Sequence, residues 1–465
     1  MKLPQIGRVN KHELQNSPFK DLPLELHLQI LSLMDLRDII AYRKTSKLFF
    51  FITSQRIIWV DLLKRVCSKN SVFKPTFPIE EMSVIDLEQA VSAPTRWLNQ
   101  VMGRNADTMR SSRRMQTITP LEYPDFYGVF LVPGGRFLVT FSETDVCVWD
   151  LGPSSGATLK NAPLASAPYV PNYDFAVVPT PDELGFWIFV SATCGATSYE
   201  MRDEFWIFEI YPLSEKPALS KIASLVYDEM EFFSLRGDLL ISYASNYVKV
   251  WNFVTNMSVK FNVGDELFEQ AWGTAESVIL FCSGMISVWS IPPLTPNGDI
   301  EETKNYPLEP SFRFRSSTAG LPQNFEMLSE WYGGHPVIYD TLSHSNAFYV
   351  SRFEIILPEG QLKEQNEFIL PPAQPPTFFE PYRFCNESLV MYWNDSKSVI
   401  AMAAPISRER HRTDSDLEEV TILSDQEELE GSVESSLCPV AGRLCRISVK
   451  RDSIIVFDYL APPPP

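Results

Sequence analysis

Two patterns of apolar and polar residues divide the chain. Between Leu24 and Met34, apolar side chains fall on almost every helical face, and only a narrow polar stripe remains at Glu25, Gln29 and Ser32. A helix on the surface of one domain normally keeps a broad polar face. After residue 114, short apolar runs are instead bounded by turn residues, which is typical of β-strands. The sequence therefore predicts an α+β multidomain protein, with a small helical part before a larger all-β part.

The helical part predicts three short helices. The first begins near Pro23, because proline suits the first turn of a helix, and the others are expected over Asp38–Tyr42 and Ser46–Ile52. Of the 45 residues from 22 to 66, 25 are apolar, and Trp59 lies near the end of this segment. Helices this short cannot bury so many apolar side chains against one another. The surplus must pack on the rest of this chain or form a docking surface for a partner protein, and both interpretations stay open.

The order and spacing of particular residues in this segment resemble the F-box. The matching positions are Leu22, Pro23, Glu25, Leu26, Ile30, Leu31, Ser32, Leu33, Asp38, Ile39, Ser46, Lys47, Phe49, Ile57 and Trp59. Thr45 stands where the family usually has valine, and Ile39–Ile40 replaces the usual leucine pair. The resemblance implies a three-helix F-box over residues 21–66 that binds the Skp-type adaptor of a Skp–cullin–F-box ubiquitin ligase. The adaptor-binding residues that it implies are Leu22, Pro23, Leu26, Ile30, Leu31 and Trp59.

The segments on either side of this F-box are simpler. Residues 1–20 are expected to form a flexible N-terminus, and residues 67–114 a linker that contains one helix. That helix is expected from Ser83 to about Met102, broken at Pro94, because proline lacks the N–H that a helix needs. The stretch from Leu87 to Asn99 looks like the segment that follows the F-box in many fungal F-box proteins.

A repeat covers the remaining residues. Each copy has a turn, a short apolar strand, a second turn and another strand, and in six of the seven copies this last strand ends in an aromatic, polar, apolar triplet. The marker residues of the seven copies are Trp149, Phe208, Trp251, Trp289, Phe353, Met402 and Phe457, the copy at Met402 being the weakest. The copies resemble degenerate WD repeats, although only Trp149–Asp150 preserves the WD dipeptide. Residues 115–461 are therefore predicted to form an all-β propeller of seven blades.

The last copy predicts how the propeller closes. In WD repeats the aromatic–Asp end falls on the third of four strands, and here the last copy ends at Asp458 with no room for a fourth strand. Because an open strand edge invites unwanted pairing, Met115–Thr119 are expected to supply the outermost strand of the last blade. Four strong markers, Trp149, Trp251, Trp289 and Phe457, are expected to pack between the blades.

Charge separates the two parts further. Residues 1–120 hold 18 Lys and Arg and 11 Asp and Glu, whereas residues 121–465 hold 22 and 47, and the whole chain has a net charge of −18. The acidic all-β part would repel phosphate backbones, so no nucleic-acid partner is expected. A protein client, if bound there, is expected to offer a basic segment. The positive N-terminal part would suit the acidic adaptor that the F-box resemblance implies.

An acidic tract covers residues 409–435, with ten Asp and Glu and two Arg. This composition predicts a disordered loop inserted between the last two blades. Within the tract, Ser415 and Ser424 precede acidic residues and look like sites for acidophilic kinases.

Other chemistry is sparse. No two of the seven cysteines form a CxxC motif, and none of the five histidines lies near them at the spacing of metal ligands. We therefore expect buried free thiols in the cytoplasm or nucleus, with no metal and no cofactor. The sequence contains no uninterrupted apolar run of about 18 residues, so no membrane-spanning helix is expected. No apolar segment follows Lys2 and Arg8, so no secretory signal is expected either. The sequence shows no hydrolase, P-loop, zinc-protease or dinucleotide-binding motif, so it gives no reason to expect an enzyme.

The favoured hypothesis is a non-catalytic subunit of a ubiquitin ligase, in which the F-box binds the adaptor, and through it the cullin, while the propeller binds a client protein. A non-degradative scaffold, which binds the adaptor without a cullin, is the alternative. A propeller enzyme with an incidental N-terminal motif is the third and weakest hypothesis.

Overall fold

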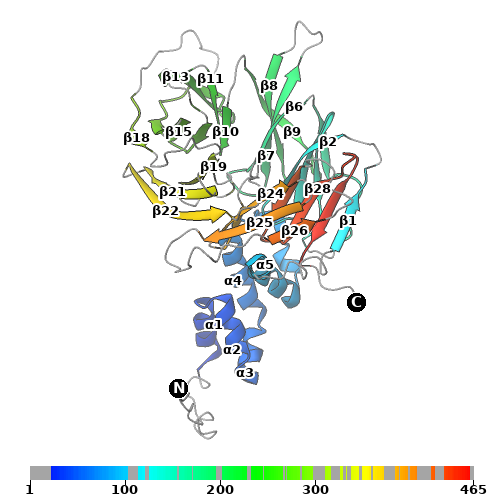
Figure 1. Cartoon of the computed structure of the whole chain (residues 1–465). Helices are drawn as coiled ribbons and strands as arrows, with labels where there is room; N and C mark the ends of the chain where they lie inside the picture. The colour runs from blue at the N-terminus through cyan, green and yellow to red at the C-terminus, as the bar shows by residue number, and fades with distance from the viewer. Residues whose placement is uncertain are drawn as a thin grey trace. The chain divides into compact units, whose positions relative to one another are not determined.

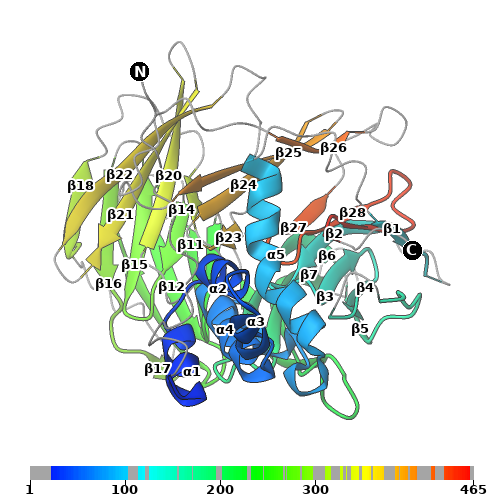
Figure 2. The ribbon, with the colours of Figure 1, turned by 90° about the horizontal axis from the view of Figure 1, so that it is seen from below.

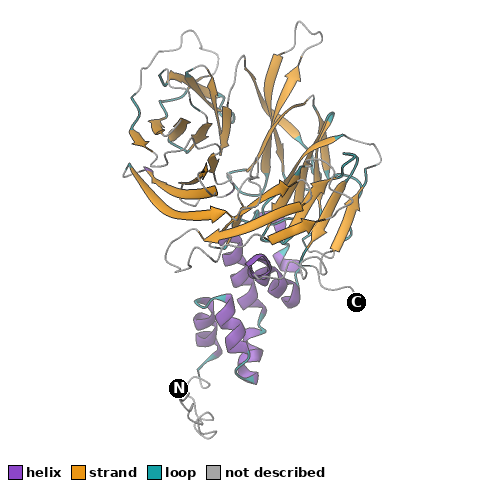
Figure 3. Ribbon diagram, viewed as in Figure 1, coloured by secondary structure: helices purple, strands orange, loops and turns teal. Residues whose placement is uncertain are grey.

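The computed structural model divides the chain into two compact units, which are described separately. The helical unit comprises Met1–Ser68 and Pro78–Ser92, and the sheet unit comprises Lys69–Phe77 and Ala93–Pro465. In the part of the chain that the structure describes, every α-helix precedes residue 103 and every strand follows residue 113 (Figure 3). The described residues are 22–102, 114–120, 125–153, 157–169, 171–194, 202–227, 232–244, 246–264, 268, 270–282, 285–296, 309–315, 325–327, 331, 337–344, 348–357, 360–370, 383–386, 388–395, 398–405, 420–424 and 434–460.

The three short helices predicted from sequence are present, and further helices follow them. The α-helices are α1 (Leu24–Ser32), α2 (Leu36–Arg43), α3 (Lys47–Thr53), α4 (Arg56–Lys69) and α5 (Val84–Met102), and two 3₁₀ turns span Lys74–Thr76 and Ile79–Glu81. Side chains cap two of these helices: the Ser46 hydroxyl accepts the Phe49 N–H at 3.2 Å, and Ser83 and Asp86 bond to each other's backbone N–H groups. Trp59 lies within α4, a helix that the sequence analysis did not predict.

Helix α5, labelled in Figure 2, continues through Pro94, so the expected break at that residue is wrong. A proline inside a helix removes one backbone hydrogen bond and crowds the preceding turn. Burial on both sides of the proline opposes that cost, because Leu87 and Val91 before it and Trp97 and Val101 after it are all almost fully buried. Their helical spacing places apolar side chains along one stripe of the whole helix.

The described strands form seven antiparallel sheets (Figure 1). The first three are β2–β5 (Phe126–Leu131, Phe137–Ser142, Asp145–Asp150, Ala165–Pro168), β6–β9 (Pro171–Pro179, Phe186–Cys194, Arg202–Ile210, Ser220–Tyr227) and β10–β13 with β17 (Phe232–Arg236, Leu239–Ala244, Tyr247–Asn252, Met257–Asn262, Thr295–Pro296). The next two are β14–β16 with β18 (Gln270–Gly273, Ser277–Cys282, Met285–Ser290, Phe312–Arg315) and β19–β22 (Phe325–Met327, Val337–His344, Phe348–Ile356, Gln361–Leu370). The last two are β23–β26 (Arg383–Cys385, Ser388–Asp395, Ser398–Pro405, Val420–Ser424) and β27–β29 with β1 (Ser435–Cys438, Arg443–Ile447, Ile454–Asp458, Arg114–Ile118).

Each marker residue of the sequence repeat lies on the third strand of a different sheet. The markers are Trp149 on β4, Phe208 on β8, Trp251 on β12, Trp289 on β16, Phe353 on β21, Met402 on β25 and Phe457 on β29. The core role expected for the four strong markers is confirmed, because none is more than 2% exposed. The all-β part therefore consists of consecutive antiparallel sheets that resemble WD-repeat blades, as the repeat predicted. The number of blades in a closed ring stays a prediction.

The predicted closing strand is confirmed. Strand β1 pairs with β29 in antiparallel register, with Met115 opposite Phe457 and Thr117 opposite Ile455. Residues near the start of the sheet region thus complete the sheet made by residues near its end. The pairing covers the edge of β29 that the repeat pattern left without a partner.

A buried ion pair fastens that last sheet to the first. The Arg443 guanidinium contacts both carboxylate oxygens of Asp458, at 2.6 and 3.3 Å, and also donates to the Gly135 carbonyl at 2.6 Å. Both partners of the ion pair are at most 4% exposed. Gly135 lies in the turn between β2 and β3, so the arginine ties two neighbouring sheets together.

The acidic tract differs from its prediction at two points. Residues 420–424 form β26, which pairs with β25, and Ser435 begins β27, which pairs with β28, so disorder is wrong for these six residues. The run Val420-Thr421-Ile422-Leu423 consists of three β-branched residues and a leucine, and it favours a strand despite the acidic residues around it. Ser424 ends this strand, with its backbone opposite Ser398. Ser415, the tract's other residues up to 433, and residues 1–20 lie outside the described residues.

The six cysteines whose state the structure describes form no disulfide, which confirms that they are thiols. Cys282, Cys385, Cys438 and Cys445 are buried, and Cys67 and Cys147 are half-buried. Burial raises the pKa of Cys67 and of Cys147 to about 12, the Asp145 carboxylate adding to the shift at Cys147. These two thiols therefore stay protonated at neutral pH and are poor nucleophiles.

Replacing Asp458 by alanine should destabilise the sheet unit by about 3–5 kcal/mol, because it leaves the Arg443 charge buried without its partner. The matched control is Lys74→Ala, which breaks an ion pair to Glu183 whose two side chains are more than half exposed, and should cost less than about 1 kcal/mol. Urea unfolding of the full chain, followed by circular dichroism of the sheets, measures both changes. Equal losses from the two variants would contradict the role given to the buried pair.

Candidate partner-docking surface

Each of the first four helices contributes to the core of the helical unit. The buried residues are Leu31 from α1, Ile39 from α2, Phe49 and Ile52 from α3, and Ile58, Trp59, Leu62 and Leu63 from α4. Trp59 is 1% exposed, and its indole N–H donates to the Thr53 carbonyl at 2.7 Å. That bond joins α4 to the end of α3 and satisfies a buried polar group.

A polar and aromatic contact holds α1 against its neighbours. His27 is buried, and its Nδ1 lies 3.0 Å from the Tyr42 hydroxyl of α2. The Tyr42 ring stacks on Phe49 of α3, with ring centroids 4.0 Å apart. Burial raises the pKa of Tyr42 to about 12, so its phenol stays neutral at physiological pH. The orientation of α1 is thereby fixed by side chains on two other helices.

The helical unit nevertheless leaves large apolar side chains in contact with solvent. They are Leu24 and Leu26 on α1, Leu33 directly after it, Leu48, Phe50 and Phe51 on α3, Ile57 on α4 and Ile85 on α5. Leu33 is 87% exposed and Phe51 is 63% exposed. Exposed apolar side chains in this number are characteristic of a surface that another protein covers.

Helix α1 presents two apolar stripes. His27 and Leu31, four residues apart, face the core of the unit. Leu26, Ile30 and Leu33 follow the same helical spacing on a different face, where Leu26 and Leu33 are exposed and Ile30 is half-buried. We refer to Leu26, Ile30 and Leu33 as the α1 stripe.

The six residues implied by the F-box resemblance occupy different environments. Pro23 and Leu26 are exposed, and Leu22 and Ile30 are half-buried, so these four can reach a partner. Leu31 and Trp59 are each 1% exposed and lie in the core, where they support the surface from beneath. Direct adaptor contact stays a prediction for the first four residues, and a supporting role is what burial allows for the last two.

The sequence analysis did not assign Leu33, Phe50, Phe51 and Ile57 to the docking surface, although all four are exposed. A signal for two of them was present in the run Phe49-Phe50-Phe51. Successive residues of a helix point about 100° apart, so three consecutive phenylalanines cannot all face one core. The structure buries Phe49 and leaves the other two largely exposed.

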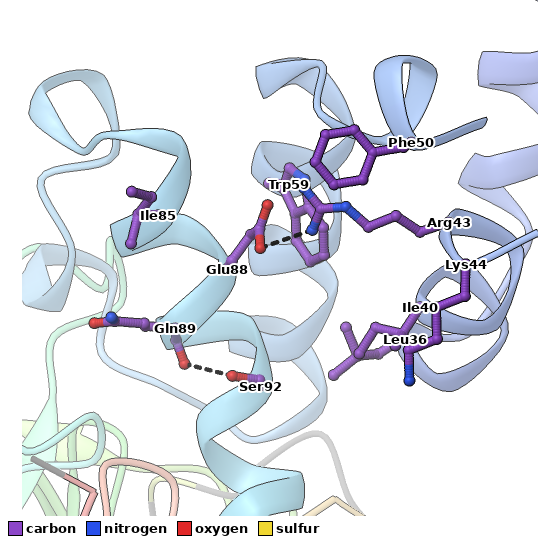
Figure 4. A pocket seen from close by; sticks show the side chains of 10 residues that line it. All are labelled: Leu36, Ile40, Arg43, Lys44, Phe50, Trp59, Ile85, Glu88, Gln89 and Ser92. Carbon is purple, nitrogen blue, oxygen red and sulfur yellow. Dashed lines mark hydrogen bonds and ion pairs between the residues drawn. The ribbon is translucent and has the colours of Figure 1, made fainter. Parts of the chain in front are cut away.

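A pocket of about 600 Å³ lies beside this surface, within the helical unit (Figure 4). Arg43 forms part of its wall: its guanidinium carbon lies 4.7 Å from the Phe50 ring centroid and 5.7 Å from that of Trp59, and its Nη1 is 2.9 Å from Glu88 Oε2. The pocket is lined by Leu36, Ile40, Arg43, Lys44, Phe50, Trp59, Ile85, Glu88, Gln89 and Ser92. Apolar walls with a polar rim can hold an apolar side chain of a partner. The described residues include no group of three or more His, Cys, Asp or Glu placed to hold a metal ion.

A comparison with protein families matches residues 19–61 to the F-box domain. The chain carries an F-box. The matched range includes α1, α2, α3 and the start of α4, and therefore all of the exposed apolar residues of the helical unit except Ile85. The whole α1 stripe belongs to the F-box.

A search of curated protein sequences finds no match. Among solved structures, the β-propeller domain of Cps50 (Swd1) from Myceliophteria thermophila is similar, with 8% identity, a TM-score of 0.44, and coverage of 74% of this chain and 99% of that one. The WD40 domain of Neurospora crassa Pan2 has 10% identity, a TM-score of 0.43, and coverage of 76% and 97%. Kluyveromyces lactis Hsv2p has 10% identity, a TM-score of 0.40, and coverage of 69% and 89%. Over the described residues, none of the helices has the length and apolar character needed to span a bilayer.

The core and the surface of the F-box should respond differently to truncation. Trp59→Ala should destabilise the helical unit by about 3–5 kcal/mol, because it removes a fully buried aromatic side chain and its hydrogen bond. Leu33→Ala, at an exposed position, should change stability by less than about 0.5 kcal/mol. Hydrogen exchange of α1–α4 amides in the full chain measures both effects, and rapid exchange in the Leu33 variant would contradict the assignment of that residue to the surface.

Proposed function

We propose that this protein is the substrate-recognition subunit of a Skp–cullin–F-box ubiquitin ligase. In this proposal the F-box binds the Skp-type adaptor, the adaptor binds the cullin, and the sheet unit binds a client protein. The observation that carries the proposal is the α1 stripe, because it places exposed apolar side chains within the F-box itself. Burying one leucine or isoleucine of this kind in an interface contributes about 1.5–3 kcal/mol, so a few such contacts support stable docking.

The chain's own contribution to ubiquitylation is to hold the client near the catalytic subunits. No catalytic motif was found in the sequence, and an F-box and a WD-like sheet region are typically interaction domains. Holding two reactants together can replace a slow bimolecular encounter by a much faster local reaction. The ubiquitin-transfer chemistry is therefore assigned to the RING and ubiquitin-conjugating subunits of the ligase.

The charge of the sheet region supports a basic client. Residues 121–465 hold 47 Asp and Glu against 22 Lys and Arg, which attracts cationic segments and disfavours nucleic acid. Phosphorylation of Ser415 or Ser424 in the acidic tract would add further negative charge to this part of the chain. A ligase of this kind acts in the cytoplasm or nucleus, and we propose the same compartments here.

Replacing both ends of the α1 stripe with charges should abolish adaptor binding. The double variant Leu26→Asp/Leu33→Asp would bury two carboxylates without partners in the proposed interface, so its affinity for the purified adaptor should fall by at least about a hundredfold. Isothermal titration calorimetry with the full chain measures this change. The matched control, Val254→Asp, alters an exposed valine on the sheet unit and should bind the adaptor as the wild type does. Unchanged affinity in the double variant would refute docking through the stripe.

Cullin assembly separates the ligase from the non-degradative scaffold. Affinity capture of the wild-type chain should recover adaptor and cullin together, and the Leu26→Asp/Leu33→Asp variant should lose both, because the cullin is expected to bind only through the adaptor. Quantitative mass spectrometry of the captured proteins provides the measurement. Recovery of the adaptor without cullin would favour the scaffold instead.

A further inference from the structure

We propose that the outer edge of β9 is the client-docking site, and that the client adds an extended, basic segment to this edge as a fifth strand. The inference rests on the proposed function for calling the partner a client. The site itself is argued from the sheet unit alone. Figure 1 labels β9 together with β6, β7 and β8, the other strands of its sheet.

Exposed apolar side chains of the sheet unit concentrate on this one sheet. Five of the eight large apolar residues that are exposed in its described part lie on β6–β9 or on the turns that join these strands. They are Leu184, Tyr211, Leu213, Ile222 and Val226. The other three, Met115, Val254 and Val449, belong to two other sheets. An uneven distribution of this kind marks an interaction surface rather than the scattered exposure of an ordinary surface.

Strand β9 offers a long backbone edge. It has eight residues, it is the last strand of its sheet, and among the described strands it pairs only with β8. In an antiparallel edge strand, alternate residues direct their N–H and C=O groups away from the sheet, where another strand can bond to them. The chain covers the corresponding edge of β13 with its own strand β17, which adds a fifth strand there. The same kind of addition is therefore compatible with this fold.

Only part of the β9 edge is protected against pairing. Lys221 and a bulge at Ile222, which has no direct partner on β8, disrupt the start of the strand. Charges and bulges are two of the devices that keep strand edges from pairing. The following five residues, Ala223-Ser224-Leu225-Val226-Tyr227, contain no charge, no proline and no register shift. This segment is the part of β9 on which a client strand would pair.

The face beside this edge selects the chemistry of the client. Val226 stands opposite Glu204, and Ser224 opposite Trp206, so these four residues share one face of the sheet. Trp206 donates from Nε1 to Glu204 at 2.9 Å, and Lys221 Nζ lies 3.6 Å from the Trp206 ring centroid. An apolar side chain of the client would pack on Val226 and the tryptophan ring. A client Lys or Arg would pair with Glu204, whose side chain is 22% exposed. The neighbouring Lys221 Nζ lies 4.0 Å from Glu204 Oε2, a long distance for an ion pair, so a client cation could approach this carboxylate more closely.

A patch of exposed apolar side chains in the turns lies at the opposite end of β9 from the pairing segment, beyond Lys221 and the bulge at Ile222, where only a longer client would contact it. Leu184 precedes β7, and Tyr211 and Leu213 follow β8, at the end where β9 begins. Asp182 in the same turn accepts hydrogen bonds from the Thr180 hydroxyl and the Leu184 N–H, which lower the pKa of its carboxyl, so it stays ionised. An acidic residue beside exposed leucines again favours a client that alternates apolar with basic residues.

A random library of twelve-residue peptides displayed on phage, selected against the full chain, tests this proposal. Selected peptides should alternate β-branched or aromatic residues with other residues and contain Lys or Arg. Synthesised peptides should protect amides of Ala223–Tyr227 from hydrogen exchange, and their affinity should fall at least about tenfold with Val226→Lys. Val254→Lys, at a valine of similar exposure outside this sheet, is the matched control and should leave affinity unchanged.

Two further measurements keep the outcome decisive. Ser224→Lys, at a second exposed position of the edge, should reproduce the loss, so the result does not depend on one variant folding well. Peptides that bind both lysine variants as tightly as the wild type, protection confined to another strand, or failure to select any peptide would each overturn the β9 site. Adaptor binding by the same proteins tests the proposed function separately, because β9 and the F-box share no residue.

Discussion

The small area that very short helices can bury against one another determines how many apolar side chains of the helical unit stay exposed. Helices α1, α2 and α3 have nine, eight and seven residues, so each can direct one stripe of about two turns to a shared core. That stripe is filled by residues such as Leu31, Ile39 and Phe49. The remaining apolar residues, including Leu26, Leu33 and Phe51, have no place in the same core. Their exposure is a consequence of helix length and composition, and a binding partner is the usual way to relieve it.

The sheet unit has an equivalent constraint in its backbone, because every sheet has two edge strands whose outward N–H and C=O groups need partners. Strand β1 pairs with the edge of β29, and β17 pairs with the edge of β13, and in both cases the added strand is not adjacent in sequence. Arginine–aspartate ion pairs add further connections in the first and last sheets, where an arginine stands at the start of the second strand of each sheet. Arg136 pairs with Asp150 and donates to the Pro75 carbonyl, much as Arg443 pairs with Asp458 and donates to Gly135. Each arginine therefore stabilises its own strand pair and also binds a neighbouring segment.

Much of this architecture is visible in the sequence because local patterns determine it. The marker residues were predictable, since in six of the seven copies an aromatic side chain in a fixed place fills the core beside the third strand. The closing strand was predictable because Met115–Thr119 alternate and the edge of β29 needed a partner. In the F-box, the spacing of residues such as Leu22 and Ile30 indicated the module, but not which of its apolar side chains face outward.

Predictions failed for two reasons. In α5, burial outweighed the preference of proline to break a helix, and in the acidic tract the average composition concealed a short strand-forming run. Pro94 argues for a break, yet Leu87, Val91, Trp97 and Val101 are buried on both sides of it, and only the folded structure shows that burial. The acidic composition of residues 409–435 concealed four consecutive strand-forming residues that make β26. The edge of β9 could not be identified beforehand, because the sequence does not show which outer strands receive a further strand.

The negative charge of the sheet region gives the proposed client interface a way to reject the wrong partner. Both proposed interfaces rely on exposed apolar side chains, and apolar contact alone discriminates poorly between proteins. Residues 1–120 carry an excess of positive charge and residues 121–465 a large excess of negative charge. The F-box itself is nearly neutral, because residues 19–61 hold six Lys and Arg against five Asp and Glu, so the discrimination by charge comes from the sheet region. Because charges steer encounter before apolar groups touch, the acidic sheet region would attract a basic client and repel an acidic adaptor from the start of association, and the adaptor would reach the F-box through its exposed apolar side chains.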